Sequence, residues 1–100
     1  MISVKVVKNN DKIKKISTMG HAMYDDYGKD IVCSAASSIV TTTVNGILSL
    51  KKGSLSYMIS KQGMNIKVLS DDNNTQILIQ NMISLLKELE KNYKDNIQVK

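Results

Sequence analysis

The sequence lacks proline, tryptophan and phenylalanine, and it contains a single cysteine and a single histidine. One cysteine has no partner for an intramolecular disulfide, which indicates a free thiol or a reducing compartment. With tyrosine as the only aromatic residue, the core must be built from Ile, Val, Leu and Met, and an apolar content of 42% is enough for one. The length of 100 residues predicts one domain that spans residues 1–100.

Arginine is also absent, so lysine carries all the positive charge of a chain with a net charge of +5. Arginine is the side chain that most often reads guanine edges and stacks on bases. The lysines are spread along the chain with no dense block, which is typical of a solvated basic surface. We therefore expect no direct nucleic-acid partner, although RNA contact through the lysines stays open as a weaker alternative.

The N-terminus has no long apolar run of the kind found in signal peptides, and no stretch is expected to reach membrane-spanning length. We expect a cytoplasmic protein without a membrane partner. One cysteine, one histidine and nearby aspartates would make a poor zinc shell, because nothing else supplies a second thiol. We therefore expect no metal and no cofactor.

The sequence does contain a regular succession of strand and helix patterns. Residues 2–6 alternate between apolar and polar, and a β-branched run over 13–19 follows the turn-forming residues 9–11, which predicts a hairpin. Residues 54–60 and 64–69 flank Lys61-Gln62-Gly63 as a second hairpin, and residues 96–99 alternate again as a last strand.

Two apolar stripes at helical spacing separate these strands. The first is Val32, Ala36, Val40, Val44, Ile47 and Leu48, in a helix that runs to about Leu50, with Asn45-Gly46 as its weakest point. The second follows the capping residues 71–74 and consists of Leu78, Met82, Leu85, Leu86 and Leu89.

The predicted order is therefore β-β-α-β-β-α-β. Two amphipathic helices packed on one face of a mostly antiparallel sheet bury both stripes economically. We expect an α+β fold of this kind.

The candidate site is formed by Cys33 and His21. A thiol attacks a carbonyl efficiently only as the thiolate, and imidazole is the usual base that produces it. In the predicted fold His21 ends the second strand and Cys33 lies in the first turn of the first helix, so both can lie at one rim of the sheet. The helix N-terminus favours the thiolate, and the N–H groups near Cys33 and Ser34 could stabilise an oxyanion. The alternative is structural, since lone cysteines are commonly small core residues.

Two further residues have two interpretations each. Asp30 can cap the first helix by accepting its free N–H groups, or it can orient the imidazole as the third member of a triad. Ser37 lies one helical turn after Cys33, where it can hydrogen-bond the imidazole or simply line a packed surface.

The loop between His21 and Cys33 is interpreted as a lid over a bound peptide. Tyrosines offer flat apolar area, a glycine offers a hinge, and aspartates can attract a substrate lysine. A solvated connector is the alternative. The residues concerned are Tyr24, Asp25, Asp26, Tyr27 and Gly28.

At these residues the chain resembles the ribosomal-processing cysteine protease family, Prp. The resemblance rests on Gly20-His21-Ala22, Tyr27-Gly28-Lys29-Asp30-Ile31-Val32-Cys33, Ala35 and Ser37, and it continues through Leu86-Lys87-Glu88-Leu89 and Tyr93 to Ile97-Gln98-Val99. It implies a small α+β domain, usually a homodimer, with Cys33 as nucleophile, His21 as base and Asp30 and Ser37 as supporting residues.

The resemblance also implies a substrate. Members of the family remove an N-terminal extension from large-subunit ribosomal protein twenty-seven, so the implied partner is a ribosomal protein precursor. Two alternatives stay open, namely a non-catalytic factor that binds ribosomal proteins or assists ribosome assembly, and a phage-type relative that processes another protein.

Overall fold

The computed structural model describes residues 1–26 and 28–100. Its elements are β1 (Ile2–Asn9), β2 (Lys12–Met19), α1 (Ile31–Leu50), β3 (Leu55–Ser60), β4 (Gly63–Val68), α2 (Asn73–Asn92) and β5 (Ile97–Val99). This is the predicted β-β-α-β-β-α-β order, and the α+β fold is confirmed.

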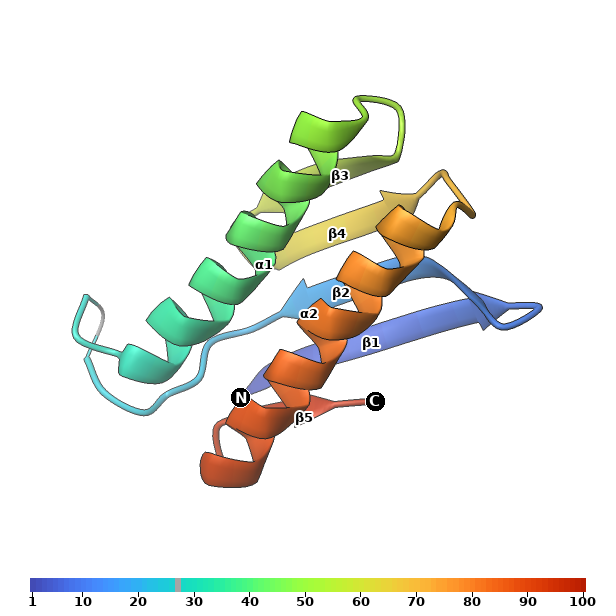
Figure 1. Cartoon of the computed structure of the whole chain (residues 1–100). Coiled ribbons are helices and arrows are strands. Elements are labelled where there is room, and N and C mark those ends of the chain that lie inside the picture. The colour runs from blue at the N-terminus through green and yellow to red at the C-terminus, as the bar shows by residue number, and fades with distance from the viewer. Residues whose placement is uncertain (27) are drawn as a thin grey trace.

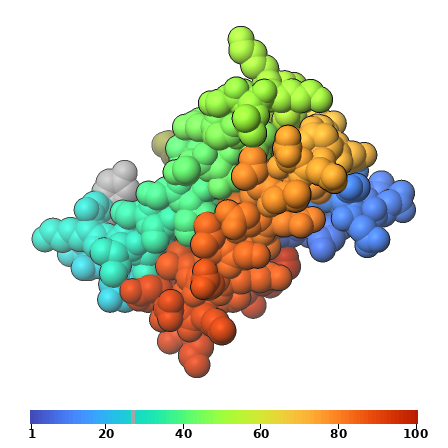
Figure 2. Space-filling model, viewed as in Figure 1, coloured from blue at the N-terminus to red at the C-terminus, as the bar shows by residue number. Residues whose placement is uncertain are grey.

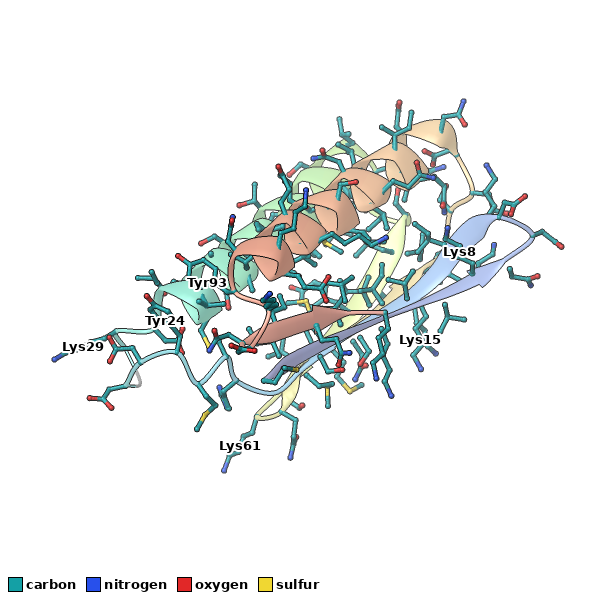
Figure 3. All side chains as sticks on the ribbon, turned by 90° about the horizontal axis from the view of Figure 1, so that it is seen from below. Lys8, Lys15, Tyr24, Lys29, Lys61 and Tyr93 are labelled. Carbon is teal, nitrogen blue, oxygen red and sulfur yellow. The ribbon has the colours of Figure 1, made fainter. Side chains whose placement is uncertain are left out.

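The strands form one sheet in the order β3-β4-β2-β1-β5. Each neighbouring pair is antiparallel except β1 and β5, which run parallel. Figure 1 shows α1 and α2 side by side on the same face of this sheet, and the view in Figure 3 agrees. The predicted arrangement of two helices on one face of a mostly antiparallel sheet is therefore correct.

The first hairpin closes at a two-residue turn. Asn10 and Asp11 both have positive φ, at 51° and 64°, and they connect the paired residues Asn9 and Lys12. Turns of this kind follow the right-handed twist of the flanking strands, and asparagine and aspartate adopt them readily.

Helix α1 buries the stripe that its spacing predicts. Val32, Ala36, Val40, Val44 and Ile47 are buried, and Leu48 is half-buried. The helix continues through Asn45 and Gly46, because burial on both sides of them outweighs their low helix propensity.

Helix α2 is rotated relative to the prediction. Its buried residues are Thr75, Gln76, Ile79, Met82, Ile83 and Leu86, whereas Leu85 is 39% exposed. A pair of hydrogen bonds to the sheet explains this rotation. The buried amide of Gln76 accepts from the Ile13 N–H at 2.9 Å and donates to the Ile13 carbonyl at 3.1 Å. This pairing turns the Gln76 side of the helix toward the sheet.

Helix α1 also passes a simple length and composition test for a membrane span, with a mean hydropathy of 1.5 over its best window. This differs from the expectation that no stretch comes near such a length. The core helix of a soluble protein passes the same test. Because the buried stripe of α1 packs into the protein core, the hydropathy carries no membrane assignment.

The molecule is elongated, with principal extents of 38 × 22 × 17 Å. Figure 2 shows the segment that leads into α1 projecting at one end and the β1–β2 hairpin projecting at the other. The candidate site lies at the first of these ends.

Candidate active site

His21 and Cys33 line one cavity of about 800 Å³. His21 follows the end of β2 and is exposed, and Cys33 lies in the first turn of α1 and is half-buried. The structure therefore places the two residues at the same rim of the sheet, as predicted.

A direct hydrogen bond joins the two sides of this site. The backbone N–H of Ala22, the residue that follows His21, donates to Cys33 Sγ at 3.2 Å. Ala22 is fully buried, which restrains its movement. A donor aimed at sulfur stabilises the thiolate more than the thiol.

The chain reaches this position through Gly20. Its φ is +90°, and a Cβ here would lie 2.4 Å from the carbonyl oxygen of Met1. The Gly20 N–H donates to the Gln62 carbonyl at 2.7 Å. Only glycine fits this passage between the N-terminus and the β3–β4 turn, which delivers His21 to the cavity mouth.

Asp30 is the N-cap of α1, as one of its two interpretations predicts. Its Oδ1 accepts from the N–H groups of Val32 and Cys33, both at 3.0 Å. Its Oδ2 accepts from Tyr24 at 2.9 Å and from Asp25 at 3.3 Å. Burial of the carboxyl raises its pKa, but these N–H donors outweigh that effect and hold the pKa below its usual value.

The triad interpretation of Asp30 stays a prediction. A carboxylate offers about four acceptor positions, and four N–H groups already use them. Within residues 1–26 and 28–100 the Asp30 side chain makes no hydrogen bond to His21. The observed contacts tie the loop to the helix start, directly beside Cys33.

The predicted oxyanion donors are both engaged in this conformation. The Cys33 N–H donates to Asp30 Oδ1, and the Ser34 N–H donates to the Asp30 carbonyl at 3.1 Å. A substrate oxygen would have to share these donors, so their oxyanion role stays a prediction. Ser37 is exposed and lines the cavity, and no hydrogen bond to another described residue involves its hydroxyl.

The loop residues divide between the cavity and the protein surface. Asp25 and Gly28 line the cavity, whereas Tyr24 places its ring edge-on against Tyr93, with centroids 5.3 Å apart. Figure 3 shows these two tyrosines together at the same end of the molecule. Asp26 is exposed, and Tyr27 lies outside the described residues.

Two features of the site join segments that lie far apart in the sequence. Asn96 Nδ2 donates to the Ala22 carbonyl at 2.9 Å, a contact that depends on the parallel pairing of β5 with β1. The far cavity wall is built from Val40 and Thr41 of α1 and from residues 59–64 around the β3–β4 turn. Neither feature has a local sequence signal, because each depends on long-range pairing.

No group of three or more His, Cys, Asp or Glu side chains in the described part of the chain is arranged to hold a metal ion. The polar side chains of the described residues that line the cavity include a thiol, an imidazole, carboxylates and hydroxyls, together with the amine of Lys61 and the amide of Gln62. This set suits nucleophilic attack and proton transfer.

Comparison with known proteins gives a consistent result. A family model described as "Cysteine protease Prp" matches residues 1–98. The ribosomal processing cysteine protease Prp of Staphylococcus aureus (strain Mu50) is 31% identical over 103 residues, covering 99% of this chain and 97% of that protein.

Two crystal structures of the S. aureus protease are similar in fold. The complex with a covalently linked product peptide has a TM-score of 0.92 at 29% identity, covering 99% of this chain and 97% of that one. The complex with a substrate peptide has a TM-score of 0.86 at 30% identity, covering 100% and 98%.

Proposed function

The chain belongs to the Prp family of cysteine proteases, and we propose that it removes an N-terminal extension from large-subunit ribosomal protein twenty-seven, with Cys33 as nucleophile and His21 as general base. The observation that carries the assignment of residues is the hydrogen bond from the Ala22 N–H to Cys33 Sγ, inside a cavity that His21 also lines. The substrate rests on the family resemblance and on the ribosomal processing role in the name of the S. aureus relative.

In the proposed reaction the Cys33 thiolate attacks the carbonyl carbon of the scissile peptide bond. A C–S bond forms and a tetrahedral oxyanion results. The His21 imidazolium gives its proton to the leaving amine as the C–N bond breaks, which leaves a thioester on Cys33. His21 then takes a proton from water, the hydroxide attacks the thioester, and the thiolate leaves.

The helix geometry supports the first step. Cys33 lies in the first turn of a 20-residue helix, where the positive end of the helix dipole favours an anion. The negative charge of Asp30 opposes this effect, but its two oxygens are occupied by four N–H donors. The N–H of Ala22 adds a donor aimed directly at the sulfur.

The cavity that the proposed catalytic pair lines has a volume of about 800 Å³. It runs from His21 and Cys33 past Ser37 to Thr41 and to the β3–β4 turn. The S. aureus structures contain a substrate peptide and a covalently linked product peptide. We infer that the peptide substrate of this chain occupies the cavity that His21 and Cys33 line.

Charge does not guide the two proteins together over a long distance, since this chain carries a net charge of +5 and ribosomal proteins are basic as a class. Recognition must therefore come from the cleavage segment. Asp25 is the loop carboxylate that lines the cavity next to the catalytic pair, so it is the candidate partner for a substrate lysine.

We also propose that the protein acts in the cytoplasm as a homodimer. The edge strand β3 exposes Tyr57, Met58 and Ile59, by 46%, 72% and 66%. An edge with free backbone groups and exposed apolar side chains is suited to pairing with a second copy. Light scattering across a concentration series tests this, and a monomer at every concentration would contradict it.

The function is tested by incubating the precursor of ribosomal protein twenty-seven with the wild-type chain and with Cys33→Ser, followed by mass analysis. Two fragments with the wild type and intact precursor with Cys33→Ser are expected. A tight complex without fragments would favour the non-catalytic binding alternative. Cleavage of a different protein, with this precursor left intact, would favour the phage-type alternative.

A further inference from the structure

Asn96 lies far from Cys33 in the sequence, yet its side chain contacts Ala22, the residue that follows His21 and donates a hydrogen bond to Cys33. Its Nδ2 donates to the Ala22 carbonyl at 2.9 Å. Its own carbonyl accepts from the Ile2 N–H at 2.9 Å, and its N–H donates to the Tyr93 carbonyl at 2.8 Å. Asn96 is therefore fixed by its backbone at both ends before its side chain makes any contact with the site.

Ala22 is held from three directions. Its side chain is fully buried in the core, its N–H donates to Cys33 Sγ at 3.2 Å, and its carbonyl accepts from Asn96. Rotation of the Ala22 backbone would break at least one of these contacts. Within residues 1–26 and 28–100, Asn96 is the one donor to the Ala22 carbonyl.

The turn that carries Asn96 makes a second contact with the same loop. Tyr93, the C-cap of α2, packs its ring against Tyr24. Asn96 and Tyr93 thus contact the loop on the two sides of Met23, whose φ of 57° is unusual for a residue other than glycine. The end of α2 acts as a platform for the loop.

We propose that Asn96 is a positioning residue of the active site: by holding the Ala22 carbonyl it keeps the Ala22 N–H directed at Cys33 Sγ and thereby favours the thiolate. This inference deepens the proposed function and rests on it for its effect on catalysis. Its effect on the thiol itself is independent of any substrate.

The test measures the rate at which iodoacetamide alkylates Cys33 as a function of pH. It compares the wild type with Asn96→Leu, which has a similar size and no donor, and Asn96→Asp, which has the same shape and no amide donor. The pH of half-maximal rate is expected to rise by about 0.5–1 unit in Asn96→Leu. The reason is that this variant loses the hydrogen bond from residue 96 to the Ala22 carbonyl. Asn96→Asp adds a negative charge and is expected to shift it at least as far.

Three controls separate positioning from general stability. Asn92→Ala changes an exposed asparagine at the end of the same helix and is expected to leave the profile unchanged. Ile66→Val lowers stability from a fully buried site in β4 and is also expected to leave it unchanged. Asn96→Gln retains an amide donor on a longer side chain and is expected to recover part of the shift.

Among residues 1–26 and 28–100, the ionisable groups that share the cavity with Cys33 are His21 and Asp25 in the loop, Asp30 at the N-cap of α1 and Lys61 in the β3–β4 turn. None of them changes in these variants. Alkylation profiles of Asn96→Leu and Asn96→Asp that superimpose on the wild type would overturn the proposal. So would an equal shift in Ile66→Val.

Cleavage assays supply a separate readout. If the proposed function is correct, kcat of Asn96→Leu is expected to fall about threefold to tenfold with little change in KM. If the wild type cleaves no precursor, the proposed function fails, while the alkylation profiles still decide the role of Asn96.

Discussion

Asp30 Oδ1 accepts the backbone N–H of Cys33 at 3.0 Å, so the group that caps α1 is bonded to the residue that carries the proposed nucleophile. The other oxygen of the same carboxylate accepts from Tyr24 and Asp25. One buried side chain therefore sets both the start of the helix and the path of the loop. Small changes at Asp30 are expected to affect the fold and the site together.

Replacing Asp30 by alanine removes four acceptor contacts to the backbone. We expect a lower thermal midpoint, by roughly 5 °C or more, and a loss of most activity, since the loop and the helix start are no longer joined. Asp30→Asn retains one acceptor oxygen, so its thermal midpoint and its activity are expected to lie between those of the wild type and those of Asp30→Ala. Calorimetry and peptide cleavage check both effects, and a wild-type midpoint in Asp30→Ala would contradict the capping role.

The acid stability of the protein follows from two caps. Hydrogen bonds hold the pKa of Asp30 below its usual value of 3.8, against the opposing effect of burial, and hydrogen bonds led by Ser70 do the same for Asp72, the N-cap of α2. A lowered folded-state pKa adds stability that is complete well above the unfolded value and is lost as the pH falls through the folded pKa.

We therefore expect the urea midpoint of the wild type to fall steadily as the pH drops below about 4. The double variant Asp30→Asn with Asp72→Asn is expected to be less stable at neutral pH and to show a flatter pH dependence in acid. Equal slopes for the two proteins would contradict the assignment of acid sensitivity to these caps.

Gly20 and Gly28 form a matched pair, because both have φ near +90° but only Gly20 meets neighbouring backbone. Gly28→Ala is expected to cost about 1 kcal/mol from backbone strain alone. Gly20→Ala adds a clash with the Met1 carbonyl, so it is expected to cost clearly more, about 2 kcal/mol or above. Denaturant unfolding measures the free energy of unfolding of both variants. Equal losses would show that the Met1 carbonyl moves aside at no cost, which would contradict the predicted clash.

Thr41 and Thr42 test whether the cavity holds the peptide. Both are exposed on α1, but only Thr41 lines the cavity. Thr41→Lys is expected to raise KM about tenfold with kcat little changed, because it obstructs binding and not the reacting groups. Thr42→Lys adds the same charge outside the cavity and is expected to behave as wild type. An equal effect of both variants would point to charge and not to the cavity.

Local patterns in the sequence were sufficient to predict most of the fold. The turn residues Asn10 and Asp11 mark the first hairpin, and the spacing from Val32 to Ile47 identifies the buried face of α1. The buried face of α2 was predicted less well, because Gln76 binds the β2 backbone and turns Ile79 and Ile83 inward. A polar side chain that pairs with a distant strand leaves no mark in hydrophobic periodicity.

The site likewise has features that local sequence predicts and features that depend on contacts between distant segments. The position of Cys33 in the first turn of a helix and the cap at Asp30 follow from local sequence. The contribution of Asn96 and the cavity wall near Thr41 do not, since both depend on strands and helices that meet only in the folded chain. The Ala22 N–H is a backbone group, and the buried side chain that helps to hold it is a feature of the folded core.

Formation of a thioester between Cys33 and the substrate can be followed by intact mass analysis after rapid acid quench of the enzyme with a peptide that spans the extension. We expect an adduct on Cys33 that adds the mass of the N-terminal fragment less one water, which appears before free fragment accumulates and is absent from Cys33→Ala. Undiminished cleavage by Cys33→Ala, or fragments that form with no adduct on Cys33 at any time, would contradict this mechanism.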